Sequence, residues 1–404
     1  MDVTEGVRAA LARLDDVAHL GAVVDRDDRA CLAAAAQIEQ SVVVSGWMGR
    51  TITVKDWIDV AGLICEGESR QRTDRRPERD ATAVLRMRNA GAIVIAKTQP
   101  GAEHPVHGRC LHPLDPERSP GGSSSGEAAL LGAGATTIGL GSDSGGSIRL
   151  PAAWCGVFGF KPSLGLVPTT GHFPRVGARQ DGRTVIGPLA TSAADLTSAL
   201  RVISGPDGVD PDCMPIPMGD PASVAIHGLR VAVVDADDAW RPASSTGDAV
   251  RRAVAVLEGL GATIVDAPLA LNLDESLEIT KHYWLRTTLS GDDSDRQLRE
   301  WDRYCGRFTR ATAKFDIVLG PTVCDVAPLA RPLTGEDFIY TLPWSLTGWP
   351  AVSIPAGADP ATGLPLAVQV AAPRWRDHVV LAVAASLEDH VPSCSAAPRS
   401  PGGG

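Results

Sequence analysis

Lysine is scarce in this chain of 404 residues. Only five of its 38 basic residues are lysine and the other 33 are arginine, which leaves lysine at positions 55, 97, 161, 281 and 314. Arginine stays protonated in proteins, whereas a buried lysine can become a neutral amine. Each lysine is therefore worth testing as a candidate base.

An excess of positive charge and long apolar runs are also lacking. The net charge of -10 argues against the basic face that nucleic acids and anionic membranes require. No apolar run reaches the about 18 residues of a membrane span, and the acidic start MDVTEGVRAALARLDD lacks the apolar segment of a signal peptide. We expect a cytoplasmic protein that binds neither nucleic acid nor membrane. A homodimer is the candidate assembly.

Paired metal-binding or redox cysteines are missing. The eight cysteines are scattered without a C-x-x-C pair, which is typical of reduced thiols. The run HPVHGRCLH places His104, His107, Cys110 and His112 close together. Structural zinc sites usually have tidier ligand spacing. We therefore expect no metal, and we expect no cofactor.

Alternating helix and strand patterns predict the fold class. Apolar residues at helical spacing predict helices within residues 5–45. A helix followed by a strand is predicted in three segments, with a glycine between the two elements in the first and third: 81–98, 127–143 and 246–267. Further strands are predicted at 51–56, 156–162, 229–237, 315–322, 350–357 and 364–373, and a last helix at 376–390. This order indicates an α/β fold, with a large mixed β-sheet core and helices on both faces.

Two glycine–serine runs, GGSSSGE (121–127) and GSDSGGSIRLPA (141–152), are the main candidates for chemistry. Neither contains the lysine of a phosphate loop, and the neighbouring glycines lack the third position of a dinucleotide fingerprint. Ser124 lies at the centre of a G-x-S-x-G match, but the polar stretch LDPERSPG precedes it where a nucleophile elbow needs a buried strand. An S-x-x-K pair is absent as well.

A serine nucleophile needs a base, and one lysine is well placed to supply it. Lys55 ends the predicted strand in TVKDWIDVAG. Desolvation lowers the pKa of a lysine, so a buried Lys55 could act as a neutral base.

At this point several long runs resemble one family, the amidase signature family of serine amidohydrolases. They are VKDWIDVAG, SPGGSSSGEAAL, GLGSDSGGSIRLPAAWCGVFGFKPS and IGPLATSAADL, followed by TGWPAVSIPAG and LPLAVQV. The resemblance covers about residues 45–390. It implies the amidase signature fold in a single amidase domain over 1–392, with N-terminal helices in 1–45 and a signature core at about 46–205. We expect the remaining tail, 393–404, to be disordered.

The resemblance also implies a Ser–cis-Ser–Lys triad. Ser147 is similar to the family's nucleophile and Lys55 to its base. Ser123 matches the bridging serine, which follows a cis peptide bond from Gly122 and lies 24 residues before Ser147.

Other residues of the two runs are expected to support this triad. Ser124 is similar to a residue that supports the network by hydrogen bonding, and we expect Asp143 to brace the loop around the nucleophile. The oxyanion would be held by the backbone N–H groups of Ser144, Gly145, Gly146 and Ser147.

Some positions depart from the family's common pattern. Tryptophan stands at four of them, and we expect at least one to shape the pocket: Trp57, Trp154, Trp344 and Trp349. Leu150 stands three residues after Ser147, where members that act on small dicarboxylic amides are expected to carry arginine.

The function that the resemblance implies is an amidase that hydrolyses a small or aryl carboxamide. The products are the carboxylic acid and ammonia or an amine, and the intermediate is acyl-Ser147. One alternative is the glutaminase (A) subunit of a tRNA-dependent amidotransferase, which has the same triad but needs partner subunits. The compact length and acidic charge weigh against it. Another alternative is a catalytically inactive relative that binds a ligand, although Lys55, Ser123 and Ser147 are all present.

Overall fold

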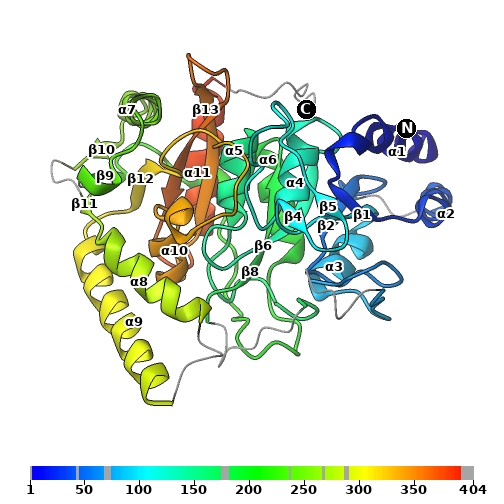
Figure 1. The fold of residues 1–404 in the computed structure, drawn as a ribbon, viewed down its shortest axis with the longest axis horizontal. Helices are drawn as coiled ribbons and strands as arrows, with labels where there is room; N and C mark the ends of the chain where they lie inside the picture. Colours follow the sequence, from blue (N-terminus) through cyan, green and yellow to red (C-terminus); the bar gives the residue numbers. More distant parts are fainter. Residues whose placement is uncertain are drawn as a thin grey trace.

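A mixed sheet of 12 strands runs through the molecule in the computed structural model, which describes residues 2–41, 45–67, 74–173, 182–235, 238–265, 269–285 and 291–392 (Figure 1). The strand order is β1-β3-β2-β6-β8-β7-β13-β14-β12-β9-β10, and β11 pairs with β9 off this path. The small hairpin β4–β5 forms a second sheet of two strands (Glu103–His104 and Gly108–Arg109). The bounds of the strands in the large sheet are β1 Val23–Asp25, β2 Thr51–Lys55, β3 Ile93–Thr98, β6 Ile138–Asp143, β7 Phe158–Lys161, β8 Val185–Ala190, β9 Arg230–Asp235, β10 Thr263–Ile264, β11 Leu269–Ala270, β12 Ile317–Pro321, β13 Ala351–Ala358 and β14 Pro365–Ala371.

Three neighbouring parallel strands bring the two glycine–serine runs and Lys55 to one edge of the sheet. Strand β2 is parallel to β3, with Lys55 opposite Thr98, and parallel to β6, with Thr53 opposite Gly139. The carboxyl ends of all three strands therefore meet at the same edge. In open α/β sheets this edge is where ligands commonly bind.

Helices cover both faces of the sheet. Four of them pack on one face: α3 (Thr82–Ala90), α6 (Ala193–Ile203), α7 (Ser244–Gly259) and α11 (Asp377–Glu388). The other face carries α4 (Ser125–Gly132), α5 (Arg149–Cys155), α8 (Leu273–Trp284), α9 (Gly291–Thr312) and α10 (Leu342–Thr347). Helices α1 (Val3–Asp16) and α2 (Asp28–Glu39) lie at one end of the molecule, and α8 and α9 lie at the other (Figure 1).

The expected large mixed sheet between two helical layers is confirmed. The N-terminal segment differs from the expectation in one respect, because the short strand β1 separates α1 from α2 and pairs antiparallel with β3. Strand β8 and helix α5 were not predicted, although α5 begins two residues after Ser147. The tail 393–404 lies outside the described residues.

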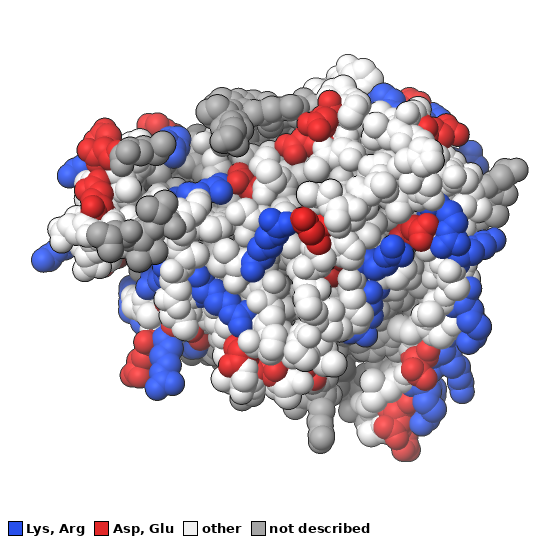
Figure 2. Space-filling view, turned by 180° about the vertical axis from the view of Figure 1, so that it is seen from behind, with Lys and Arg blue, Asp and Glu red and all other residues white. Residues whose placement is uncertain are grey.

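The surface charge and the helices can be described directly from the structure. Basic and acidic side chains are interspersed over the face seen in Figure 2 rather than gathered into one basic field. Among the described residues, no helix is both long and apolar enough to cross a membrane.

A buried carboxyl group joins the serine-bearing helix to the lysine-bearing strand. Glu127 of α4 is fully buried and accepts hydrogen bonds from the hydroxyl groups of Thr53 on β2 (2.5 Å) and Thr98 on β3 (2.7 Å). Burial raises the pKa of Glu127 to about 7, against the opposing effect of both hydrogen bonds and of the positive charges of Lys97 and Lys55. The carboxyl group thus fixes α4 against two strands of the site edge.

The buried position of Glu127 predicts a pH-dependent stability difference. Between the ordinary glutamate pKa of 4.5 and the raised pKa of about 7, the unfolded chain has lost this proton while the folded protein keeps it. The contribution of Glu127 to the free energy of unfolding therefore falls as pH rises through this window. Glu127→Gln removes this titration. As the pH rises from 4.5 to 8, the free energy of unfolding of the variant should therefore increase relative to that of the wild type by up to about 3 kcal/mol.

Urea unfolding of both proteins at pH 5 and pH 8 measures this difference. Glu258→Gln on the exposed face of α7 is the matched control for the loss of one carboxylate. A difference between Glu127→Gln and the wild type that does not change with pH would contradict the prediction.

Candidate active site

The amine of Lys55 lies within hydrogen-bonding distance of a serine hydroxyl. Lys55 is fully buried at the end of β2, and its Nζ is 2.7 Å from Oγ of Ser123. Ser123 itself is half-buried, and the peptide bond that joins it to Gly122 is cis. A buried amine that contacts a solvent-reachable hydroxyl can exchange a proton with it.

Ser142 completes the surroundings of the lysine amine. Its hydroxyl and its carbonyl oxygen lie 3.3 Å and 3.5 Å from Nζ of Lys55. The same carbonyl is 3.5 Å from the hydroxyl of Ser124. Trp57 lies over the amine, with its ring centroid 4.3 Å from Nζ. Several short contacts from different segments therefore fix the position of the amine.

Ser147 lies half-buried in the loop between β6 and α5. The two glycine–serine runs are tied together at this point, because the N–H of Ser124 donates to the carbonyl of Ser147 at 3.0 Å. The structure thus brings Ser147, Ser124 and Ser123 into one cluster, with Lys55 beside it.

A buried ion pair holds the Ser147 loop in shape. Asp143 accepts hydrogen bonds from the guanidinium of Arg149 at 3.0 Å through both of its oxygens, and it also accepts one from the N–H of Ile148 at 3.2 Å. Burial alone would raise the pKa of Asp143. The charge and hydrogen bonds of Arg149 outweigh this effect and hold the pKa below its usual range. Asp143 therefore braces the loop from inside.

The Asp143 carboxylate also accepts a hydrogen bond from one of the expected oxyanion donors. The N–H of Gly146 donates to Oδ1 of Asp143 at 2.7 Å, so it is already engaged within the protein. Asp143 lies beneath the loop, which draws this N–H inward. Among the described residues, we find no hydrogen-bond acceptor for the N–H groups of Ser144, Gly145 and Ser147.

Most of the four tryptophans belong to the hydrophobic core. Trp154, Trp344 and Trp349 are 3%, 2% and 5% exposed. Trp349 also lines a cavity of about 640 Å³ together with Leu346, Cys305 and Arg374. Trp57 is the member of this set that contacts the Lys55 cluster.

The histidine-rich run does not form the cluster that its sequence suggests. His112 contacts the carbonyl of Trp154 at 2.8 Å and Cys110 is buried in the core, whereas Glu66 lies beside His104 and His107. Nδ1 of His104 accepts two backbone N–H groups, both at 3.1 Å, so its Nε2 carries the proton. Glu66, His104 and His107 each offer one ligand atom, all within 4.8 Å of one another, and the buried Nε2 of His104 has no hydrogen-bond partner among the described residues.

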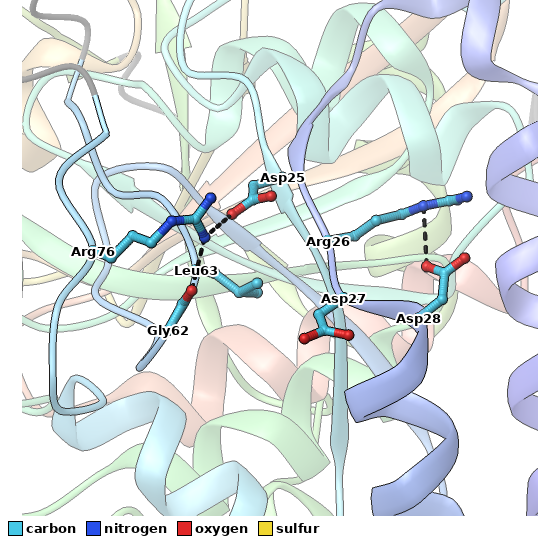
Figure 3. A pocket seen from close by; sticks show the side chains of 7 residues that line it. All are labelled: Asp25, Arg26, Asp27, Asp28, Gly62, Leu63 and Arg76. Carbon is cyan, nitrogen blue, oxygen red and sulfur yellow. Dashed lines mark hydrogen bonds and ion pairs between the residues drawn. The ribbon is translucent and has the colours of Figure 1, made fainter.

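A separate acidic hollow lies between β1 and the segment around Gly62 (Figure 3). Its volume is about 430 Å³, and its acidic side chains already have partners. Asp25 pairs with Arg76 at 2.7 Å, Asp28 pairs with Arg26 at 3.1 Å, and Asp27 accepts from the first turn of α2 at 2.9 Å. The hollow is therefore lined by side chains that already have partners, and these side chains are separate from the serine cluster.

The comparisons with known proteins agree with this geometry. The family model described as Amidase matches residues 5–293 and 282–381. The chain belongs to the amidase signature family. Among curated relatives, the glutamyl-tRNA(Gln) amidotransferase (A) subunit of Deinococcus radiodurans is 30% identical, over 95% of this chain and 92% of that protein. The protein of the same name from Methanococcoides burtonii is 28% identical, over 98% of this chain and 95% of that protein.

Solved members of the amidase signature family share the fold. The structure of 6-aminohexanoate cyclic dimer hydrolase superposes with a TM-score of 0.83 and 25% identity, over 99% of this chain and 95% of that one. The peptide amidase of Stenotrophomonas maltophilia superposes with a TM-score of 0.81 and 22% identity, over 96% of this chain and 94% of that one.

Sequence reasoning missed several residues that surround the serine cluster. Arg149 was considered only as a residue near the arginine position of dicarboxylic-amide enzymes, yet it is fully buried against Asp143, and Leu150 is in the core. Glu127 could have been noticed as the single charge in an otherwise apolar helix. Ser142 left no clear signal, because a serine in a strand is common.

The Asp143–Arg149 pair predicts a large loss of stability when one partner is neutralised. In Asp143→Asn, Arg149 would remain as a buried charge without its counter-ion, and we expect a loss of about 3–5 kcal/mol in the free energy of unfolding. Asp248→Asn is the matched control, since Asp248 pairs with Arg251 on the surface of α7, where ion pairs contribute little. Denaturant unfolding measures both variants, and equal losses in the two would refute the bracing role of Asp143.

Proposed function

We propose that this protein is an amidase that hydrolyses small or aryl carboxamides through an acyl-Ser147 intermediate. The observation that carries this proposal is the 2.7 Å contact between the buried amine of Lys55 and the hydroxyl of Ser123, beside half-buried Ser147. A general base must lie within hydrogen-bonding reach of the hydroxyl that it deprotonates, and the contact between Lys55 and Ser123 meets this requirement.

In the proposed reaction, Lys55 accepts a proton from Ser123 while Ser123 accepts one from Ser147. The Oγ of Ser147 then forms a bond to the amide carbonyl carbon. The carbon–nitrogen bond breaks after the leaving amine receives a proton back through the same relay. Water adds to the acyl-serine and releases the carboxylic acid, so each turnover consumes one amide and one water.

The negative charge that develops on the carbonyl oxygen needs donors close to Ser147. The N–H groups of Ser144, Gly145 and Ser147 are the candidates, because Asp143 engages that of Gly146. Backbone donors held by a braced loop need little reorganisation during the reaction, which is the main advantage of such a site.

The relatives favour a second candidate, the glutaminase component of a tRNA-dependent amidotransferase. Curated proteins at 28–30% identity carry that name, and they align along nearly the whole chain. This activity would use the same three residues but would take glutamine as the substrate and require partner subunits. We favour the stand-alone amidase because the chain is compact and acidic.

Substitution of the proposed nucleophile and base tests the reaction. Ser147→Ala and Lys55→Ala should each lower kcat by about a thousandfold or more, because the members of such a triad act as a unit. Ser223→Ala and Lys281→Ala, at exposed positions, are the matched controls and should keep wild-type rates. Undiminished turnover by Ser147→Ala would refute the mechanism.

The substrate preference separates the two candidate functions. The purified chain alone should release ammonia or amine from simple alkyl and aryl carboxamides, because its proposed triad is complete within one chain. The measurement is a panel of these amides and glutamine, followed by product analysis. If the panel shows hydrolysis of glutamine but of none of the other amides, and only when partner subunits are added, the result would support the amidotransferase component instead.

A further inference from the structure

Arg183 is a buried cation that contacts the Ser147 loop. It lies just before β8, is 1% exposed, and donates from Nε to the carbonyl oxygen of Ser144 at 2.9 Å. Its Nη1 donates to the hydroxyl of Thr280 on α8 at 3.1 Å, and its guanidinium lies 4.5 Å from the ring centroid of Tyr283. These contacts fix the guanidinium firmly behind the loop.

The contact with Ser144 acts on a neighbouring N–H group. The carbonyl of Ser144 and the N–H of Gly145 belong to the same conjugated peptide unit. A charged donor on the carbonyl oxygen withdraws electron density from the nitrogen, and hydrogen bonds along such a chain strengthen one another. The N–H of Gly145 therefore becomes a better donor than an ordinary backbone amide.

Packing fixes the direction of this peptide unit. A Cβ atom added to Gly145 would lie 3.3 Å from the ring of Trp284, 3.6 Å from Leu342 and 3.7 Å from the guanidinium of Arg183. The Gly145 carbonyl also accepts a hydrogen bond from the hydroxyl of Thr341. The peptide units before and after Gly145 are thus each held by one hydrogen bond, the first from Arg183 to the Ser144 carbonyl and the second from Thr341 to the Gly145 carbonyl.

The two buried arginines that contact the loop, Arg149 and Arg183, have different partners. The charge of Arg149 is balanced by Asp143, which also engages the N–H of Gly146. Arg183 contacts a carbonyl oxygen whose peptide N–H has no acceptor among the described residues. The first arginine braces the loop, and the second is placed to polarise it.

We propose that Arg183 is a positioning residue that strengthens the Gly145 N–H as an oxyanion donor by holding and polarising the Ser144 carbonyl. This inference rests on the proposed function, in which Ser147 is the nucleophile. It adds to the triad a residue that never touches the substrate and acts only when charge develops on the carbonyl oxygen.

The rate at which Ser147 reacts with an alkyl fluorophosphonate tests this role without knowledge of the natural substrate. The phosphoryl oxygen of this probe gains charge in the same position as the amide oxygen. Arg183→Met should lower the second-order rate constant by about tenfold to a hundredfold, since removal of a full oxyanion donor costs about a hundredfold to a thousandfold. Intact mass and peptide mapping measure the extent and the site of labelling.

Two further variants separate polarisation from a structural role. Arg183→Lys keeps a positive donor and should recover most of the rate, although it lacks the planar fork of arginine. Arg86→Met is the matched control, because Arg86 clamps the backbone carbonyls of Ile203, Ser204 and Gly205 at 2.7–2.8 Å without contacting the Ser147 loop. It should leave the labelling rate within about twofold of the wild type.

A ground-state measurement completes the test. In the Ser147→Ala background, addition of Arg183→Met should leave the Kd for a bound amide unchanged within about threefold, because the effect is confined to the charged state. Equal labelling of Arg183→Met and the wild type at Ser147 would overturn the role of Arg183 alone. If Arg183→Met does not fold, a loss of about tenfold or more in a folded Arg183→Lys would overturn it instead. Absence of Ser147 labelling in the wild type would instead overturn the proposed function.

Discussion

The ion pair between Asp143 and Arg149 is the interaction on which the candidate site depends. It is fully buried, and the Asp143 carboxylate also accepts the N–H groups of Gly146 and Ile148, which flank Ser147 on either side. A buried charge is costly unless it is paired and hydrogen-bonded, and here both conditions are met. The shape of the loop is therefore set by this buried ion pair and its hydrogen bonds rather than by regular secondary structure.

Much of this arrangement could be predicted from the sequence because it is local. The strand that ends at Lys55 and the two glycine–serine runs were visible as short patterns, whereas the roles expected for their residues came from the resemblance to the amidase signature family. The mixed sheet followed from the alternation of strands and helices. The contact between Arg183 and Ser144 could not be predicted, because it joins positions 39 residues apart through the pairing of β6 with β8. The hydrogen bond from the Gly146 N–H to Asp143 is local, but it could not be predicted either, because only the folded loop shows which N–H faces the carboxylate.

Family membership and site geometry answer different questions about this protein. The fold is shared with enzymes whose names describe quite different substrates, 6-aminohexanoate cyclic dimer and glutamyl-tRNA(Gln). The structure of this chain shows which further side chains surround Lys55 and the Ser147 loop. Trp57 lies over the Lys55 amine, Trp284 lies against the Ser147 loop, and Arg183 contacts the loop from behind. Function in such a family depends on the residues around a common scaffold.

The guanidinium of Arg149 also joins the Ser147 loop to distant parts of the chain. Besides Asp143, it donates to the carbonyl of Thr341, to Ser345 and to Gln369, all at 2.9 Å. These acceptors lie 192 to 220 residues after Arg149, at the start of α10, within α10 and on β14. The loop therefore takes its shape only when α10 and β14 have packed against it, so local unfolding of either element would release the loop as well.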